Sequence, residues 1–307
     1  ASVGTCSGRG MRLWSWGGRP QHENCHRLLL RRRRLEMNRC LWANEIDHFA
    51  AEIYNRHWSD NTLTRGDIRG FSPTQAVDLI CGGDPCPCRS TARGNRPSKH
   101  PDLSGYFLAV VGRLRPQWVV RENVPAPDVA DFTACLEALG YRSIVVELDA
   151  RDFTSQSRRR QYCIGVPPSL ASRFAGILSD ACDGEGFTAS LPEEETVIAA
   201  CITAHPNRMA AEDTYCFEPD WNRGGGLRFL LSEECESLQG FPRGWTSGLS
   251  RSRRRILLGN AVCVPVVRWI GERIMETIGG GFTFGELFAG IGGFRLGFEI
   301  AGGSPNA

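Results

Sequence analysis

The sequence lacks the features that mark several special classes of protein. None of its apolar runs approaches the roughly 18 to 20 residues that a membrane-spanning helix needs. Its 13 cysteines are odd in number and scattered without a disulfide framework, which favours a reduced protein of the cell interior. Hydrophobic residues make up 41% and charged residues 23% of the 307 positions, so collagen-like, coiled-coil and disordered classes are excluded for most of the chain. We expect a soluble globular protein of one large domain or two smaller ones.

Lysine is almost absent, because Lys99 is the only lysine among 36 basic residues. The arginines that make up the rest offer a planar fork of donors suited to phosphates and guanine edges. The formal net charge of +2 is too small to indicate a nucleic-acid partner by itself. Residues 1–36 end in a basic run and show no periodicity, so we expect a disordered basic tail or a leader, with a DNA-touching arm as the alternative.

Short apolar runs alternate with helical patterns between residues 39 and 166. We expect strands at 40–45, 77–80, 118–123, 142–148 and 162–166, and helices at 47–58, 105–114 and 128–139. This alternation predicts an α/β fold with a mostly parallel sheet and helices on both faces. Such sheets bind ligands beyond the carboxyl ends of their strands, so functional residues are expected there.

The alternation stops after Pro167. Residues 167–226 are rich in Gly, Pro, Asp and Glu, and only residues 196–202 give a weak strand signal, so we expect an irregular segment. Helices are predicted again at 232–238, with Ser232 as the cap, and at 264–278. We expect residues 167–255 to form a small second domain, between a first part (37–166) and a second part (256–307) of the main domain.

The last predicted unit is a strand at 282–288, a glycine-rich loop at 289–293 and a helix at 294–301. Such a loop lets the backbone approach a nucleotide-type ligand, and an acidic residue about 20 positions on is needed to hold ribose hydroxyls. The sequence stops before that position, but joining Gly302 to Arg39 restores the spacing to Glu45, which ends the first strand. We infer a circular permutation, which predicts that Glu45 and Gly290 are neighbours. A structural tight turn is the alternative.

Three further groups of residues carry chemistry at the same predicted edge of the sheet. Cys86 lies in a loop just past a buried strand, and Glu122 lies at the end of the next strand. Gln156, Arg158 and Arg160 stand at alternate positions, so an extended backbone would place all three on one face. The alternatives are a small buried cysteine, a structural glutamate and a solvated charge run. No metal site is expected, because the cysteines near position 86 lack zinc-ligand spacing and a histidine partner.

Together these motifs resemble those of the DNA cytosine-5 methyltransferases, over residues 39–165 and 226–303. The resemblance rests on the segments Phe288-Ala289-Gly290-Ile291-Gly292-Gly293, Pro85-Cys86, Glu122-Asn123-Val124, Gln156-Ser157-Arg158-Arg159-Arg160, Leu238-Gln239-Gly240-Phe241-Pro242 and Gly259-Asn260-Ala261-Val262. The glycine loop comes first in the common order of that family and last here, as in its permuted members. Two positions depart from the family pattern: Pro87 replaces a glutamine, and Glu286 stands where an aspartate is common.

The resemblance implies a Rossmann-like fold of the S-adenosylmethionine-dependent methyltransferases with a small target-recognition domain, and it suggests roles for individual residues. It implies that the cofactor S-adenosyl-L-methionine is held by Phe288, Ala289, Gly290, Gly292, Gly293, Glu45, Ile46, Asp67, Ile68, Pro85, Asn260 and Val262. It implies catalytic roles for Cys86, Glu122, Arg158 and Arg160. It implies contacts with DNA from Ser90, Arg93, Gln156, Gln239 and Arg254.

The implied reaction is methylation of cytosine C5 in a base flipped out of the duplex. A Cys86 thiolate, with its pKa lowered by Arg158 or Arg160, would add to C6 of the base. Glu122 would protonate or hydrogen-bond N3, and Arg158 would fix the base through O2.

We therefore expect a monomeric DNA (cytosine-5) methyltransferase that acts on a short sequence in double-stranded DNA, as in a restriction-modification system. We expect it in the cytoplasm, encoded by a prokaryote or a phage. An RNA cytosine-5 methyltransferase is one alternative. An inactive DNA-binding module, or one half of a two-chain methyltransferase, is the other.

Overall fold

A computed structural model of the chain describes residues 37–85, 102–126, 128–183, 199, 201–202, 215–217 and 227–303. The predicted basic tail at 1–36 lies outside the described residues. Among the helices that the structure describes, none combines the length and the apolar character needed to cross a membrane.

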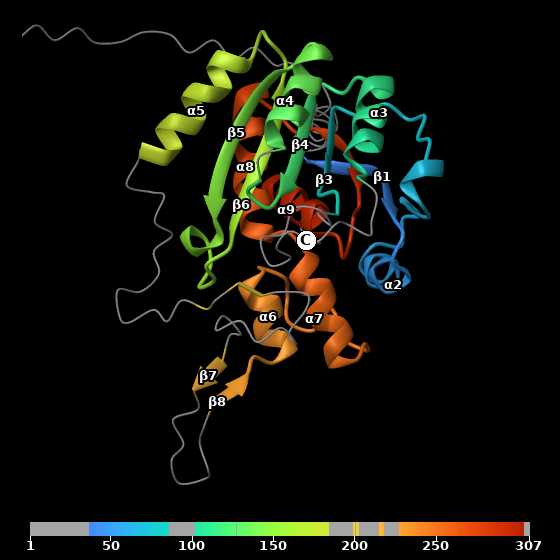
Figure 1. Cartoon of the computed structure of the whole chain (residues 1–307), viewed down its shortest axis with the longest axis vertical. Helices are drawn as coiled ribbons and strands as arrows, with labels where there is room; N and C mark the ends of the chain where they lie inside the picture. Colours follow the sequence, from blue (N-terminus) through green and yellow to red (C-terminus); the bar gives the residue numbers. More distant parts are fainter. Residues whose placement is uncertain are drawn as a thin grey trace, which may run out of the picture. The chain divides into compact units, whose positions relative to one another are not determined.

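Seven strands form one sheet in the order β2-β1-β9-β3-β4-β6-β5 (Figure 1). Their bounds are β1 (Arg39–Glu45), β2 (Leu63–Arg65), β3 (Leu79–Gly82), β4 (Trp118–Asn123), β5 (Arg142–Asp149), β6 (Arg159–Val166) and β9 (Thr283–Leu287). The pairs β2–β1, β1–β9, β9–β3 and β3–β4 are parallel, whereas β4–β6 and β6–β5 are antiparallel. The predicted α/β fold with a mostly parallel sheet is confirmed. Two further strands, β7 (Tyr215–Phe217) and β8 (Leu227–Phe229), form a separate antiparallel pair.

The central strand β9 is held closely by both of its neighbours. Its Phe284 and Leu287 side chains are fully buried. Gly285 leaves room for the Trp42 indole of β1, since a Cβ at residue 285 would lie 2.1 Å from a ring carbon. Gly82 of β3 passes equally close, since its Cβ would lie 2.3 Å from the Leu287 carbonyl oxygen. Glycine at these two positions is therefore required for β9 to lie between β1 and β3.

Helices cover both faces of the sheet, as predicted, with α4 and α8 on opposite sides in Figure 1. One face carries α3 (Ser104–Leu114) and α4 (Val129–Ala138), whose Phe107 and Phe132 pack on Val119. The other carries α5 (Ala171–Asp183), α8 (Val264–Ile278) and α9 (Gly293–Ala301), whose Phe298 and Phe174 share a core with Trp118. Two short 3-10 turns, η1 (Ile68–Gly70) and η3 (Ala150–Asp152), follow β2 and β5.

A third core joins α2 (His48–His57), α6 (Ser232–Leu238) and α7 (Arg251–Asn260). Ile53 of α2, Cys235 of α6 and Leu258 of α7 are buried together in it. Ile291 of the glycine loop belongs to the same core, so this loop rests on all three helices. Asp47 caps α2, because its side chain accepts from the backbone N–H groups of residues 49 and 50.

The prediction that residues 167–226 are irregular is wrong for residues 171–183, which form α5. Phe174 and Leu178 lie four residues apart on α5 and are both buried. Phe174 meets the Trp118 ring of β4 at a centroid distance of 5.0 Å, so this helix belongs to the core of the sheet. The polar and glycine-rich composition of the residues that follow α5 hid this amphipathic pattern in the sequence.

Two other boundaries differ from the prediction. Ser232 is the first residue of α6 rather than its cap, and the Leu231 N–H instead donates to the Glu234 carboxylate at 2.7 Å. The expected domain boundary at residue 255 falls inside α7, a helix that was not predicted. The many arginines of this segment weaken its apolar pattern, but Leu257 and Leu258 are buried in the third core.

Arg295 of α9 is the centre of a buried polar network. Its guanidinium donates to Glu299 at 2.7 Å, to the Thr62 hydroxyl at 2.7 Å, to the Tyr54 hydroxyl at 3.3 Å and to Asp60. The Arg295 side chain is only 5% exposed. The network therefore ties the last described helix to α2 and to the loop before β2.

Replacing Arg295 with methionine is expected to lower the free energy of unfolding by roughly 3 kcal/mol, because the largely buried Glu299 carboxylate loses its cation. Urea unfolding measures the difference. The control is Arg268→Met, which removes an exposed pair with Glu272 on α8 and is expected to cost at most about 1 kcal/mol. Equal losses in the two variants would contradict a stabilising role for the network.

Candidate active site

The carboxyl ends of β1, β9, β3 and β4 meet at one edge of the sheet, because these neighbouring strands are parallel. The glycine loop follows β9, Glu45 ends β1, Gly83 follows β3 and Glu122 lies near the end of β4. A cavity at this edge is lined by Gly83, Glu122, Asn260, Ala261, Val262, Glu286, Phe288, Ala289, Gly290, Ile291, Gly293 and Phe294. Residues that follow β3 or lie near the end of β4 therefore share one cavity with residues of the C-terminal segment 260–294.

The prediction that Glu45 and Gly290 are neighbours is confirmed. The Gly290 N–H donates to Glu45 Oε2 at 2.7 Å, and the Asp47 N–H donates to Glu45 Oε1 at 2.7 Å. Burial raises the pKa of the Glu45 carboxyl, and these backbone hydrogen bonds partly oppose the rise. The carboxylate is thus held at the start of the glycine loop.

The glycine loop has an unusual backbone. Gly290 and Gly292 have φ values of +55° and +83°, which glycine adopts without strain. Phe288 has a φ of +55°, which a bulky side chain rarely adopts and which is typical of functional loops. Trp58 packs on the loop so closely that a Cβ at Gly292 would lie 2.2 Å from its ring.

Val262 closes the cavity from the other side, since a Cβ at Gly293 would lie 2.6 Å from its Cγ2 atom. Asn260 lines the same wall and is exposed. The structure therefore brings together several of the residues expected to hold the cofactor, namely those of the glycine loop, Glu45, Asn260 and Val262. Pro85, also expected there, is exposed three residues after the end of β3.

The remaining expected cofactor residues lie beside Glu45, where β1 and β2 end. Ile46 is 63% exposed, which leaves its side chain free for a ligand. Asp67 is the N-cap of η1, and its carboxylate accepts from Arg69 Nε at 3.0 Å. This guanidinium lowers the pKa of Asp67 to about 2. Ile68 is buried and supports the turn.

Glu286 lies in the floor of the cavity and is fully buried. The backbone N–H groups of Phe294 and Arg295, at the start of α9, approach its carboxylate without reaching ordinary hydrogen-bond geometry. Burial raises the pKa of Glu286 to about 8, against the opposing charge of Arg295 and these backbone N–H groups. The carboxylate therefore makes no strong hydrogen bond with another described side chain, which leaves it able to accept from a ligand that carries a donor or a positive charge.

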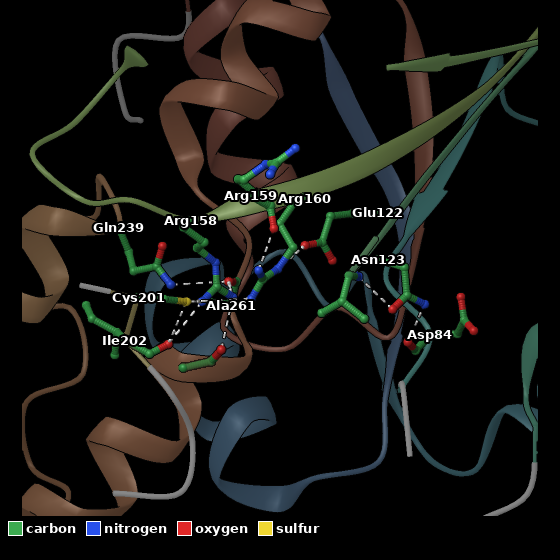
Figure 2. A network of polar contacts seen from close by, with 12 residues as sticks. Asp84, Glu122, Asn123, Arg158, Arg159, Arg160, Cys201, Ile202, Gln239 and Ala261 are labelled. Atoms are coloured by element: carbon green, nitrogen blue, oxygen red, sulfur yellow. Dashed lines mark hydrogen bonds and ion pairs between the residues drawn. The ribbon is translucent and has the colours of Figure 1, made fainter. Parts of the chain in front are cut away.

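Glu122 faces the cavity and is paired with Arg160 of β6 (Figure 2). Arg160 Nε lies 3.1 Å from Glu122 Oε1. Burial raises the pKa of Glu122, and the guanidinium groups of Arg160 and Arg158 oppose the rise. Gly83 passes alongside, since its Cβ would lie 3.0 Å from Glu122 Oε2. The Glu122 carboxyl is thereby placed in a mostly buried, charge-balanced position suited to proton transfer.

Arg158 is placed differently from the prediction. Its guanidinium donates to the backbone carbonyls of Ile202, Gly259 and Ala261 at 3.0, 3.0 and 2.9 Å (Figure 2). The side chain is 4% exposed. A contact between Arg158 and a base is therefore not supported, because both of its terminal nitrogens already donate to the main chain. Arg158 instead fastens the segment at residues 201–202 to the turn after α7.

Three residues expected to contact DNA have their polar groups turned inward. Gln156 and Gln239 are fully buried, and Gln156 Nε2 donates to Gln239 Oε1 at 3.3 Å. Arg254 pairs with Glu233 at 2.7 Å and with Glu236 at 2.9 Å. The prediction of DNA contacts from these side chains is not supported, because their donors are satisfied inside the protein. Cys86, Ser90 and Arg93 lie outside the described residues.

Sequence reasoning missed two features of the site. The first is Trp58, whose ring shapes the glycine loop, and nothing in its local sequence points to that contact. The second is a buried ion pair between Asp84 and Arg121. A charged residue directly after the apolar run Trp118-Val119-Val120 is a signal that could have found this pair.

The fold is that of an S-adenosylmethionine-dependent methyltransferase: it has the mostly parallel sheet, the glycine loop after β9 and the Glu45 carboxylate at the end of the neighbouring strand β1. The S. pombe Dnmt2 methyltransferase shares this fold with a TM-score of 0.57 and 16% identity, covering 78% of this chain and 91% of that one. The Entamoeba histolytica methyltransferase EhMeth shares it with a TM-score of 0.53 and 14% identity, covering 77% and 90%.

The chain belongs to the C-5 cytosine-specific DNA methylase family, whose model matches residues 27–199 and 193–276. It is 25% identical to the type II methyltransferase M.MspI of Moraxella sp, over 79% of this chain and 67% of that protein. It is 27% identical to the type II methyltransferase M.Bsp6I of Bacillus sp. (strain RFL6), over 78% and 91%. The predicted family and enzyme class, a DNA cytosine methyltransferase, are confirmed, and the family and fold imply use of S-adenosylmethionine.

Replacing Gly292 with alanine is expected to weaken the binding of S-adenosylmethionine by about tenfold or more, because both the φ and the Trp58 ring force the loop to move. Isothermal titration calorimetry measures the affinity. Gly279→Ala is the matched control, since Gly279 also has a positive φ of +77° but has open space around its Cβ. Wild-type affinity in Gly292→Ala would show that the loop geometry does not matter for binding.

Replacing Glu286 with glutamine is expected to stabilise the protein increasingly as the pH rises from about 4.5 to 8. In this window the unfolded chain releases the Glu286 proton while the folded chain keeps it, so ionisation works against folding. Urea unfolding at pH 5 and pH 8 measures the stability difference between the variant and the wild type. The partly exposed Glu272→Gln variant should follow the wild-type pH dependence. The same pH dependence in Glu286→Gln would contradict the raised pKa.

Proposed function

We propose that this chain transfers a methyl group from S-adenosylmethionine to C5 of a cytosine in a short sequence of double-stranded DNA. The observation that supports this most is the shared cavity. Gly290, whose N–H donates to Glu45, and Glu122, which pairs with Arg160, both line this cavity. Gly83, in the segment that leads to Cys86, lines it as well. Cofactor, acid and nucleophile could therefore act on one base.

The lining of the cavity suits S-adenosylmethionine in two respects. Gly290 has open space around the position of its Cβ, which leaves the loop backbone accessible to a ligand, and the buried Glu286 carboxyl in the cavity lining suits the positive charge of this cofactor. We propose that the loop backbone at 288–293, Asn260 and Val262 hold the methionine half. Glu45 would accept from the ribose hydroxyls, and Ile46, Asp67 and Ile68 would hold the adenine. When bound, the cofactor supplies an electrophilic methyl group on a sulfonium.

The chain's own residues supply the activation of the base. Cytosine C5 is a poor nucleophile until another group adds to C6, and a Cys86 thiolate can form that bond. Glu122, whose pKa is raised by burial, would donate a proton or a hydrogen bond to N3 as negative charge develops on the ring. After C5 has taken the methyl group, loss of the C5 proton re-forms the double bond and expels the Cys86 thiolate. The base must be flipped out of the duplex for this contact.

We propose that Arg160, and not Arg158, is the arginine of the reaction site. Arg160 pairs with Glu122, whereas Arg158 is held by backbone carbonyls. Arg160 would keep Glu122 oriented and add positive charge beside the base. Arg158, Gln156 and Gln239 would act as structural ties, and contacts with the DNA backbone would come from Ser90 and Arg93.

The order of the segments is also proposed to be permuted. The family match ends at residue 276, before β9 and the glycine loop. Gly302 lies against Asn38, since a Cβ at Gly302 would be 2.4 Å from the Asn38 nitrogen. A link between these two residues would place β1 directly after α9, which is the order that the spacing to Glu45 predicts. Within this scheme residues between α5 and α7 would recognise the target sequence, and a monomer in the cytoplasm would suffice.

The Cys86→Ser variant tests the covalent step. A duplex with 5-fluorocytosine at the target position should form a denaturation-resistant complex with the wild type in the presence of S-adenosylmethionine, because C5 then has no proton to lose. Cys86→Ser should form no such complex on a denaturing gel, whereas the control Cys135→Ser, at an exposed position on α4, should form it as the wild type does. A trapped complex with Cys86→Ser would contradict the assignment of the nucleophile.

A further inference from the structure

Asp84 and Arg121 form a buried ion pair at the point where the chain leaves β3 towards Cys86. Arg121 Nε lies 2.5 Å from Asp84 Oδ1, and Arg121 Nη2 lies 2.9 Å from Asp84 Oδ2. The two side chains are 2% and 1% exposed. The guanidinium also lies 4.3 Å from the centre of the Phe132 ring and 3.5 Å from Asp128 Oδ2. Both oxygens of Asp84 are thus fixed by Arg121 of β4, whose guanidinium is in turn held by Asp128 and Phe132.

The backbone of the same segment is held from β4 as well. Asn123 Nδ2 donates to the Asp84 carbonyl oxygen at 3.3 Å (Figure 2). The β3–β4 ladder ends with Gly82 opposite Arg121. The side-chain contacts of Asp84 therefore hold the chain to β4 beyond the last pair of the ladder. Pro85 follows, and its ring restricts Asp84 to an extended backbone. The contacts of the Asp84 side chain and carbonyl, together with the ring of Pro85, therefore fix the direction of the backbone at Asp84, two residues before Cys86 in the sequence.

The side chains of β4 make different contacts on its two faces. Arg121 and Glu122 are successive strand residues, so their side chains point to opposite faces of the sheet. Glu122 faces the cavity, while Arg121 lies against Phe132 on the far face. Because Gly83 approaches Glu122 and Asp84 pairs with Arg121, the loop after β3 is gripped from both faces of the strand that carries the acid.

Stability alone does not explain an ion pair at this place. Phe132, Val119 and other apolar side chains surround the far face of β4, and apolar residues of similar volume would pack there without the cost of burying two charges. What a bidentate guanidinium–carboxylate pair adds is a defined distance and angle between the groups that it joins.

We infer that the Asp84–Arg121 pair is a positioning device that sets the Cys86 thiol against the Glu122 carboxyl for methyl transfer. The inference rests on the proposed function. Neither residue touches the base, so both act through the backbone that links them to Cys86 and Glu122. No such role follows from the motifs of the sequence.

The test compares the single variant Arg121→Met with the double variant Asp84→Leu/Arg121→Met. The single variant leaves a buried carboxylate without its cation and should lose both thermal stability and activity. The double variant removes both charges and should regain a Tm close to that of the wild type. If the pair positions the thiol, the kcat for methyl transfer to duplex DNA in the double variant should stay about a hundredfold below the wild type, with KM for S-adenosylmethionine unchanged.

A second variant, Arg121→Lys, keeps the charge but replaces the planar fork by a single ammonium group. It should fold like the wild type, and its kcat should still fall. The control is the double variant Arg268→Met/Glu272→Leu, which removes an ion pair on the surface of α8 and should change neither kcat nor KM.

Recovery of wild-type kcat in Asp84→Leu/Arg121→Met together with its Tm would overturn the inference, since the pair would then serve folding only. Wild-type kcat in Arg121→Lys, or a loss confined to the KM for S-adenosylmethionine, would overturn it as well. These outcomes leave the proposed function intact. Absence of methyl transfer by the wild type measured in parallel would instead refute the proposed function, and this inference with it.

Discussion

β9 hydrogen-bonds to β1 on one side and to β3 on the other, and the whole site depends on this placement. The strand delivers the glycine loop to the same edge as Glu45 and Gly83, although residues 283–293 are at least 200 positions away from both in the sequence. Two glycines, Gly285 and Gly82, make the close packing possible. Were β9 displaced, the hydrogen bond from Gly290 to Glu45 and the cavity wall at Glu286 would be lost together.

Several ionisable side chains are buried in the interior of this protein. Glu45, Glu122 and Glu286 are buried near the cavity, and burial raises the pKa of each. Two arginines partly neutralise the charge of these carboxyl groups. Arg160 pairs with Glu122, and Arg295 lies near Glu286 without donating a side-chain hydrogen bond to it. The cavity therefore combines carboxyl groups that can hold a proton with a positive frame around them, which suits the handling of a cationic cofactor and a ring that becomes anionic.

The sequence was sufficient to predict most of the fold. Alternating apolar runs located six of the seven strands of the main sheet, and the interrupted spacing from Gly290 to Glu45 predicted a contact between the two ends of the described chain. Side-chain partners could not be predicted in the same way. Arginines at 158 and 254 looked alike as charged residues, yet both are held inside by carbonyls or carboxylates that come from distant segments. The α5 helix was missed because the polar composition of the residues after it outweighed the spacing of Phe174 and Leu178.

We propose that one chain unites the C-terminal glycine loop with the N-terminal strands in a site that methylates cytosine at C5. The most direct test incubates the purified chain with methyl-labelled S-adenosylmethionine and mixed-sequence duplex DNA, followed by bisulfite sequencing of the product. We expect label on the DNA and protection from bisulfite conversion at cytosines in one short sequence context. Label without such protection, label only on RNA, or no transfer despite cofactor binding would contradict it.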